Sequence, residues 1–556
     1  MKEINPYSTE PETVPSQPYW LIQTIRLLVA LGFLLGLFSI WSRYFIFTDG
    51  AVYATLGKNL ASGVGLRYCG GTHLFYPPGY PLAIAALYFL LHNAELAAHL
   101  VSFIAYMGSI IIMARLAWMM RPSPVFTLSA IIIIMLHPYF LLYASYVMSE
   151  SLFIFIVLSS SLCAWKIAMQ KKSPFWLWCL WGALGGYAYL IRADGIIYWP
   201  LQAFFVAVAH WCAMRRLSLH AVIRGSLAAV IFIGVMFPYI YLIADQTSQW
   251  QLSTKTAILL EFSRMKMNDG TTQGETRQTS RLSEDGKSFV IDQAKETLSS
   301  FLINNPRQAL DRVLWNWQRL FRRNGLVFSW LTIPLFGILV WILRGRIINL
   351  KSFFLILHAS PIIIFSLFYI DQRFILVFIP FFALAYARVL EWLFVLVRSI
   401  SKRNIIVFVL PAVLVPSILA MPFIAPRIIN NVRKVFASNL PLEHKIMGSW
   451  MKQNLAITPV TRITHRNPWV SFYAEGCHKR TPGMDISLTE EERLSRLVKW
   501  SRELGVKYLI VDQRMTLPYM PEYVFLLEND VSREGLKHIK TISSPGPRIV
   551  LYEIEP

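Results

Sequence analysis

The chain has 556 residues, of which 55% are hydrophobic, 14% aromatic and only 15% charged, and its mean hydropathy is +0.47. Soluble globular proteins carry roughly 25% charged residues, so this composition excludes an ordinary soluble protein. The net charge of +21 does not indicate a nucleic-acid partner, because much of it lies in short loops beside apolar runs, as membrane topology requires.

Apolar runs long enough to cross a bilayer recur along the chain. We place the basic clusters that follow these runs in the cytoplasm, which leaves the N-terminus inside and the C-terminus outside. The sequence therefore predicts a multi-pass α-helical membrane protein of about eleven spans. They are residues 22–46, 95–118, 124–141, 147–169, 174–191, 195–214, 221–243, 325–343, 353–370, 374–397 and 404–423. The apolar segment Pro81–Leu91 is too short to span, and we expect it to lie on the outer membrane surface.

This path divides the chain into a transmembrane domain, residues 1–423, with long outward loops at 47–94 and 244–324, and an outward soluble domain, residues 424–556. The tail alternates helical stretches such as LEHKIMGSWMKQNL with strand-like ones, VTRIT, VKYLIVD and RIVLYEI. TEEERLSRLVKWSRELG carries a capping box at Thr489/Glu492 and a glycine stop at Gly505. We expect a small C-terminal α/β domain.

The first outward loop opens with FTDGAVYATLGKNLASGVG, where the first apolar run ends. Asp49 is suited to cap the helix expected at Gly50–Ala61 and to complement its dipole, which does not exclude a catalytic role. The following HLFYPPGYP forms a rigid turn. Its aromatic residues either anchor in the headgroup zone or stack on a sugar or isoprenoid, and Arg67 and His73 are weaker candidates for binding an anion.

Three later motifs place charges at the same outward face. MSESLF puts Glu150 at the start of a span, where a carboxylate is expensive and usually functional, although the helix dipole also favours it. In GALGGYAYLIRADG, Arg192 and Asp194 either pair locally or leave Arg192 free to face a phosphate. Arg373 in DQRFILVFIPFF breaks the positive-inside pattern, so we expect it to bind an anion.

Carboxylates suit general-base or metal chemistry, and arginines suit a phosphate leaving group. The combination suggests transfer from a lipid phosphate donor where lipid and water meet. Whether a divalent metal takes part is left open, with Asp49 and Glu150 as its ligands if it does. The candidate substrate-binding residues are Tyr53, His73, Tyr76, Tyr80 and Asp194.

The motifs DGAVYATLGKNLASGVG, YPPGYPL, MSESLF, GALGGYAYLIRADG and DQRFILVFIPFF, followed by an outward tail, resemble in their order and spacing the GT-C superfamily of membrane glycosyltransferases. The resemblance is closest to the branch of protein mannosyltransferases and lipid A aminoarabinose transferases, which use polyprenyl-phosphate sugars. It implies a bacterial inner-membrane enzyme that takes a polyprenyl-phosphate-sugar donor and a glycolipid, wall polymer or protein as acceptor.

The resemblance also implies roles for residues. Asp49 matches the proposed catalytic base, Glu150 a second acidic residue of the site, and Arg373 the arginine that contacts the lipid-linked phosphate, with Arg192 and Arg67 as further candidates. The implied reaction is a direct inverting displacement through an oxocarbenium-like transition state. The acidic doublet common in the family's first motif is missing, because Gly50 follows Asp49, which puts two-carboxylate metal binding at that point in doubt.

Two other functions stay open from the sequence. A transporter or flippase of lipid-linked sugars also needs charges near the membrane, although it would favour ionisable residues at mid-depth and related halves. A scaffold that acts through its tail is the other.

Cys69 and Cys477 both fall in outward segments, where a disulfide between the first loop and the tail can form. The sequence does not tell which sugar moves, what accepts it or the oligomeric state.

Overall fold

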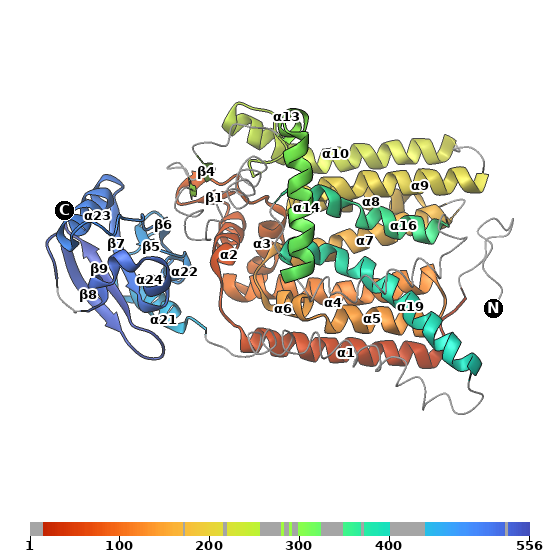
Figure 1. Cartoon of the computed structure of the whole chain (residues 1–556), viewed down its shortest axis with the longest axis horizontal. Coiled ribbons are helices and arrows are strands. Elements are labelled where there is room, and N and C mark those ends of the chain that lie inside the picture. Colours follow the sequence, from red (N-terminus) through yellow and green to blue (C-terminus); the bar gives the residue numbers. More distant parts are fainter. Residues whose placement is uncertain are drawn as a thin grey trace.

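The computed structural model describes residues 15–170, 173–214, 219–255, 280–282, 289–291, 298–323, 349–368, 372–400, 440–528 and 532–556. A bundle of long helices occupies one end of the molecule and a small sheet domain the other (Figure 1). The predicted spans 325–343 and 404–423, and the boundary predicted at 423/424, lie outside the described residues.

The bundle confirms a multi-pass helical membrane protein. Within the described ranges, six helices are long and apolar enough to cross a membrane. These are α1 (Tyr19–Ser42), α4 (Ala94–Met120), α7 (Ser149–Met169), η1 with α9 (Ala193–Ile197, Tyr198–Met214), α10 (Leu219–Thr247) and the segment Arg373–Leu396, which includes most of α19 (Ile379–Ile400). The shorter apolar helix α8 (Phe175–Ile191) packs among them. The predicted number of eleven spans stays a prediction.

The span predicted at 124–141 is broken into α5 (Pro124–Leu136) and α6 (Pro138–Ser145), which meet at 56°. Pro138 has no N–H to continue the helix and drives the residue before it into extended geometry, so His137 ends α5. By contrast, α16 (Leu350–Ala359) continues into α17 (Pro361–Phe365) through Ser360, which keeps helical dihedral angles, so the two form one shorter apolar helix. If the bent pair counts as one span, the described candidates number seven.

The first outward loop contains α2 (Thr48–Ala61), a hairpin of β1 (Arg67–Tyr68) and β2 (Gly71–Thr72), and α3 (Gly79–Leu91). The expectation that Asp49 caps this helix is wrong. The N-cap is the extended residue Phe47, and Asp49 is the second helical residue. The helix therefore begins two residues earlier than expected, and the Asp49 carboxylate bonds to Arg373, outside the helix.

Gly79 in the PPGYP turn lets α3 approach the end of α8. A Cβ at this position would lie 2.6 Å from the backbone of Leu190 and Ile191, so only glycine fits without displacing backbone. The Tyr187 hydroxyl donates a hydrogen bond of 2.8 Å to the Gly79 carbonyl. This contact holds the first loop against the residues that lead into Arg192.

The tail is a five-stranded mixed sheet in the order β6-β5-β7-β9-β8, which confirms the α/β character expected from the sequence. Its strands are β5 (Arg462–His465), β6 (Cys477–Arg480), β7 (Val506–Asp512), β8 (Leu536–Ile542) and β9 (Ile549–Ile554). The strand β5 pairs in parallel with β6 and β7, and β9 pairs antiparallel with β7 and β8. Helices α21 (Leu442–Asn454), α22 (Trp469–Tyr473), α23 (Glu490–Glu503) and α24 (Gln513–Tyr519) connect or cover these strands.

The expected helix boundaries in the tail are confirmed. Thr489 and Glu492 form a reciprocal capping box at the start of α23. Gly505 follows this helix with a φ of +59°, in the left-handed region that favours glycine.

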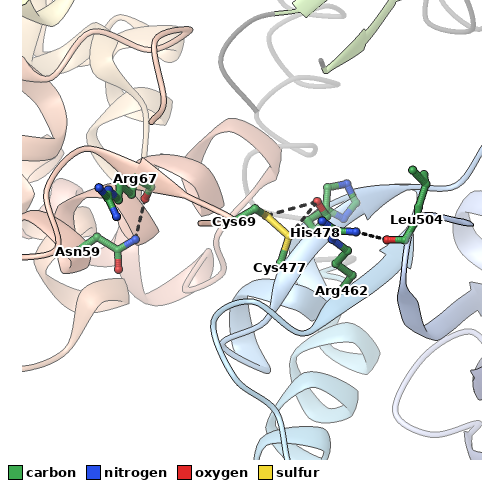
Figure 2. Close-up of a disulfide and its surroundings, with 7 residues drawn as sticks. All are labelled: Asn59, Arg67, Cys69, Arg462, Cys477, His478 and Leu504. Carbon is green, nitrogen blue, oxygen red and sulfur yellow. Dashed lines mark hydrogen bonds between the residues drawn. A yellow bond between two sulfur atoms is a disulfide. The ribbon is translucent and has the colours of Figure 1, made fainter. Parts of the chain in front are cut away.

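The sheet domain is fastened to the bundle at the end where α2 begins. A disulfide joins Cys69, in the turn of the β1–β2 hairpin, to Cys477 of β6, with Cα atoms 4.9 Å apart (Figure 2). The Ile46 N–H donates to the Tyr473 hydroxyl at 3.2 Å, and Lys445 forms an ion pair with Glu95 at 2.8 Å. The tail and the first loop therefore lie at the same end of the bundle.

Candidate active site at the end of the helical bundle

Two acidic and two basic side chains meet near this end of the bundle, each from a different part of the chain. Asp49 lies in the first turn of α2, Glu150 in the first turn of α7, and Arg192 directly after α8. Arg373 lies in the short helix α18 (Gln372–Ile375). Residues 324 positions apart thus become neighbours, because Arg373 Nη1 donates to Asp49 Oδ2 at 2.9 Å.

Arg192 holds the second carboxylate. Its Nη1 lies 3.2 Å from Glu150 Oε1, while its Nε lies 3.0 Å from Asp194 Oδ1. The guanidinium also lies 5.3 Å from the ring centres of both Phe153 and Phe374. Arg192 is therefore fixed by charge and by aromatic contact. The local pair with Asp194 is present, and the phosphate-facing role stays a prediction.

The two arginines lie close to Glu150 in a tightly packed part of the site. Glu150, Arg192 and Arg373 are grouped there with apolar side chains that include Phe153 and Phe374. Arg373 interacts electrostatically with Glu150 as well as with Asp49. Its Nε is buried and makes no hydrogen bond within the described part of the chain.

Asp49 is surrounded by groups that favour its ionised form. Burial alone would raise its pKa, but the positive charges of Arg373 and Lys255 and a hydrogen bond donated by the Tyr76 hydroxyl outweigh burial. The pKa of Asp49 therefore lies below its ordinary value, and the carboxylate is a charged proton acceptor at neutral pH.

Sequence reasoning did not identify Lys255. Its ammonium lies 4.3 Å from the ring centre of Phe75 and 4.1 Å from that of Tyr76, the residue that bonds Asp49. Burial lowers the pKa of Lys255 to about 7. The sequence did offer one signal for it. Lys255 lies eight residues beyond the end of α10, in a loop predicted to face outward.

Aromatic residues of the first loop support the carboxylates. Tyr53 packs against Tyr76 and Tyr80 with ring centres 4.6 and 5.0 Å apart, and its hydroxyl hydrogen-bonds with Ser149, beside Glu150. Tyr80 is fully buried, and its hydroxyl lies 2.8 Å from that of Ser102. In this structure Tyr80 therefore packs beneath the site, whereas Tyr53 and Tyr76 contact it.

His73 and Arg67 take different positions from the other candidates. His73 stacks on Tyr76 at 5.4 Å, and burial lowers its pKa to about 3, so it is neutral at pH 7 and presents no charge to an anion. Arg67 has an exposed side chain in β1, and its carbonyl accepts a bond from Asn59 (Figure 2). We find no contact of Arg67 with Asp49 or Glu150 among the described residues.

Each carboxylate that the sequence suggested as a metal ligand has an arginine partner. A cation bound by Asp49 and Glu150 would have to replace contacts of 2.9 Å to Arg373 and 3.2 Å to Arg192. A metal at this place stays a prediction. A separate group, His444, His465 and Asp512, lies in the tail domain and offers three donor atoms to a metal ion.

No family model matches the sequence, and no curated protein matches it. Solved structures do. ArnT from Cupriavidus metallidurans in the apo state is 12% identical over 96% of this chain and 98% of that chain, with a TM-score of 0.54. The same protein bound to undecaprenyl phosphate has a TM-score of 0.52 and is 13% identical, over 96% of this chain and 98% of that chain. A third structure is the archaeal oligosaccharyltransferase AglB from Archaeoglobus fulgidus, in complex with an inhibitory peptide and a dolichol-phosphate. Its TM-score is 0.56, and it is 15% identical over 95% of this chain and 74% of that chain.

ArnT and AglB are GT-C superfamily membrane glycosyltransferases. The chain has the GT-C fold. This confirms the resemblance read from the sequence motifs, at the level of the fold, and over nearly the whole chain.

Proposed function

We propose that this protein is an integral membrane glycosyltransferase that moves a sugar from a polyprenyl-phosphate-linked donor to an acceptor hydroxyl at the outer face of the membrane. The observation that carries the proposal is the Asp49–Arg373 pair beside the Glu150–Arg192 pair, at one end of a GT-C fold. The ligands named with the structural neighbours, undecaprenyl phosphate for ArnT and dolichol-phosphate for AglB, support a lipid-linked donor.

In the proposed reaction the acceptor hydroxyl binds at Asp49. The acceptor oxygen forms a bond to the anomeric carbon, while the bond from that carbon to the phosphate oxygen breaks. The proton of the hydroxyl passes to the Asp49 carboxylate, and the polyprenyl phosphate leaves with the electron pair. Attack opposite the leaving group inverts the configuration at the anomeric carbon.

The arginines meet the charge that develops on the leaving phosphate. Arg373 is suited to this step because its Nε has no partner among the described residues and its Nη1 is shared with Asp49. Arg192 is held by Glu150 and Asp194, so it supplies a preorganised positive charge. Lys255, above Tyr76, is a third cation within this group. We assign Glu150 the role of fixing Arg192 and adding negative charge opposite an oxocarbenium-like sugar.

We propose further that the protein lies in a bacterial inner membrane, with the site and the tail domain on the outer side. The transmembrane catalytic domain is proposed to comprise residues 1–423 and the extracytoplasmic domain residues 424–556. A glycolipid, a wall polymer or a protein hydroxyl is the acceptor class, and a divalent metal at Asp49 and Glu150 is compatible with the proposal without being needed for any step above.

The experiment that tests the proposal compares envelope glycolipids and glycoproteins by mass spectrometry with and without the gene. A sugar-sized mass difference that returns with the wild-type gene, and not with Asp49→Asn, is expected. Asp245→Asn is the matched control, because Asp245 is an exposed carboxylate at the end of α10. A flippase or a scaffold would tolerate Asp49→Asn, so full complementation by that variant would refute an enzymatic role.

A further inference from the structure

Three buried side chains converge in the tail domain, in a cluster that the proposed sugar transfer does not use. His444 comes from α21, His465 ends β5 and Asp512 ends β7. Each is at most 1% exposed, and one donor atom from each lies within 4.8 Å of the others. His465 Nε2 lies 2.6 Å from Asp512 Oδ2, and His444 Nε2 lies 3.5 Å from Asp512 Oδ1.

The surroundings of His465 leave its inner nitrogen facing a carboxylate. Its Nδ1 lies 2.8 Å from the carbonyl oxygen of Asn467, closer than the 3.4 Å to the Asn467 nitrogen, which favours a proton on Nδ1. Nε2 then faces the Asp512 carboxylate at hydrogen-bonding distance, and the contact is favourable when Nε2 carries a second proton or when both atoms bind a common cation. A histidine that donates its outer N–H to a carbonyl and offers Nε2 inward is the usual arrangement of a metal-bound imidazole.

His444 likewise turns Nδ1 toward an outer acceptor and Nε2 toward Asp512. Its Nδ1 lies 3.3 Å from Glu443 Oε1, and Arg514 contacts the same carboxylate at 2.6 Å. Both ring nitrogens of His444 are fully buried, yet neither makes a hydrogen bond of normal geometry within the described residues. A buried imidazole without a satisfied donor or acceptor is unfavourable, and an ion between His444 and Asp512 would satisfy it.

We propose that His444, His465 and Asp512 bind a Zn²⁺ ion. Two imidazole nitrogens and one carboxylate oxygen are a donor set that zinc accepts in a tetrahedral site, with the fourth position left to water. Ligands about 2.0 Å from an ion in that geometry are separated by roughly 3.3 Å. The two imidazoles approach different oxygens of Asp512, His465 at 2.6 Å from Oδ2 and His444 at 3.5 Å from Oδ1. The three donor atoms lie within 4.8 Å of one another, so binding the ion requires the side chains to move closer together.

The proposed ion would fix the face of the tail that meets the bundle. It ties α21 to the ends of β5 and β7. The ring of His444 also meets Trp469 of α22 at 5.0 Å, and Trp469 in turn packs on Phe45 at 5.6 Å. Phe45 lies in the segment that leads into α2 and Asp49. The role is structural and does not depend on the proposed sugar transfer.

The test uses the full-length protein purified without added metal. Metal content measured by inductively coupled plasma mass spectrometry is expected to give about one zinc per chain. The zinc content is expected to fall tenfold or more in His444→Gln and to be unchanged in His538→Gln, a partly buried histidine of β8 outside the cluster. After removal of zinc with a chelator, the thermal midpoint is expected to fall, and Co²⁺ is expected to restore it with the visible bands of a tetrahedral site.

Two results would overturn the proposal. The first is a wild-type protein that contains no metal and takes up neither Zn²⁺ nor Co²⁺, which would leave a purely hydrogen-bonded histidine–aspartate cluster. The second is bound zinc that folded His444→Gln retains, which would place the ion elsewhere, for example at Asp49 and Glu150. If His444→Gln does not fold, His444→Cys keeps a zinc ligand at this position. Its Co²⁺ form must then show thiolate charge-transfer absorption, and failure to do so counts against the site.

Discussion

Removal of the Arg373 side chain is expected to impair chemistry far more than stability. In the structure Arg373 pairs with Asp49 at 2.9 Å, and the two side chains are 35% and 28% exposed. An ion pair that is this accessible contributes roughly 1 kcal/mol or less to the free energy of unfolding. The thermal midpoint of Arg373→Ala is therefore expected to stay within a few degrees of the wild type.

The effect on transfer follows from the leaving group. Loss of one preorganised donor to a developing negative charge costs about 2.7–4 kcal/mol of transition-state stabilisation, a rate factor of about 10²–10³. Arg373 offers both the Nη1 shared with Asp49 and the free Nε to the phosphate, so we expect a loss in the upper part of that range. The loss should appear in kcat, because the negative charge on the leaving oxygen is larger in the transition state than in the bound donor.

The assay measures transfer by purified protein in lipid nanodiscs, with a polyprenyl-phosphate-sugar lipid fraction as donor and product detected by mass spectrometry. Thermal unfolding is followed in the same samples. Arg496→Ala is the matched control, since Arg496 is exposed on α23 in the tail. Transfer by Arg373→Ala within about fivefold of the wild type would refute the assignment to the leaving phosphate. A collapse of the thermal midpoint that parallels the loss of activity would make Arg373 a structural residue instead.

Three further predictions rest on neighbouring contacts. Arg192→Leu leaves two poorly exposed carboxylates without their cation, so unfolding is expected to become easier by about 3–5 kcal/mol, and a thermal midpoint near that of the wild type would contradict the pairing. With a pKa of about 7, Lys255 is about 90% protonated at pH 6 and about 10% at pH 8. Donor affinity should therefore weaken as the pH rises, and Lys255→Arg should remove this dependence. An equally steep fall of donor affinity with pH in that variant would exclude Lys255 as the cause. Proteolytic nicking between the two domains should leave one band on non-reducing electrophoresis until a reductant breaks Cys69–Cys477, and fragments that separate without reductant would disprove the disulfide.

The charged residues of the site could be predicted from the sequence because each is anomalous where it stands. A carboxylate at the start of an apolar helix and an arginine on the outward side of a span are costly unless they have a partner. Glu150 and Arg373 were recognisable on that ground alone. Their partners were not, since the Asp49–Arg373 contact joins segments 324 residues apart, and only the packing of the helices sets which arginine meets which carboxylate.

Other features were missed for physical reasons that can be named. Hydropathy averages over a window, so the run at 124–141 looked continuous although Pro138 breaks it. Capping preferences suggested Asp49 as an N-cap, but its pairing with Arg373 and the extended Phe47 place the helix start earlier. The edge strands β6 and β8 carry several charged or polar side chains, CHKR and LKHIKTI, and show little apolar periodicity.

The histidine cluster of the tail gave no sequence signal either. His444, His465 and Asp512 are spaced too widely to match a metal-binding motif, and each is an ordinary residue of its own element. Only the fold of the sheet, with α21 packed at the ends of β5 and β7, brings them within 4.8 Å.

The central claim is that Asp49 takes the proton of the acceptor in a sugar transfer. It is tested most directly by Asp49→Asn in the purified transfer assay, because asparagine keeps the size of the side chain and removes the base. A general base contributes about 10²–10⁴ to the rate, so we predict that kcat falls by at least a hundredfold while the thermal midpoint and donor binding persist. Transfer by Asp49→Asn within tenfold of the wild type, in folded protein, would contradict the account.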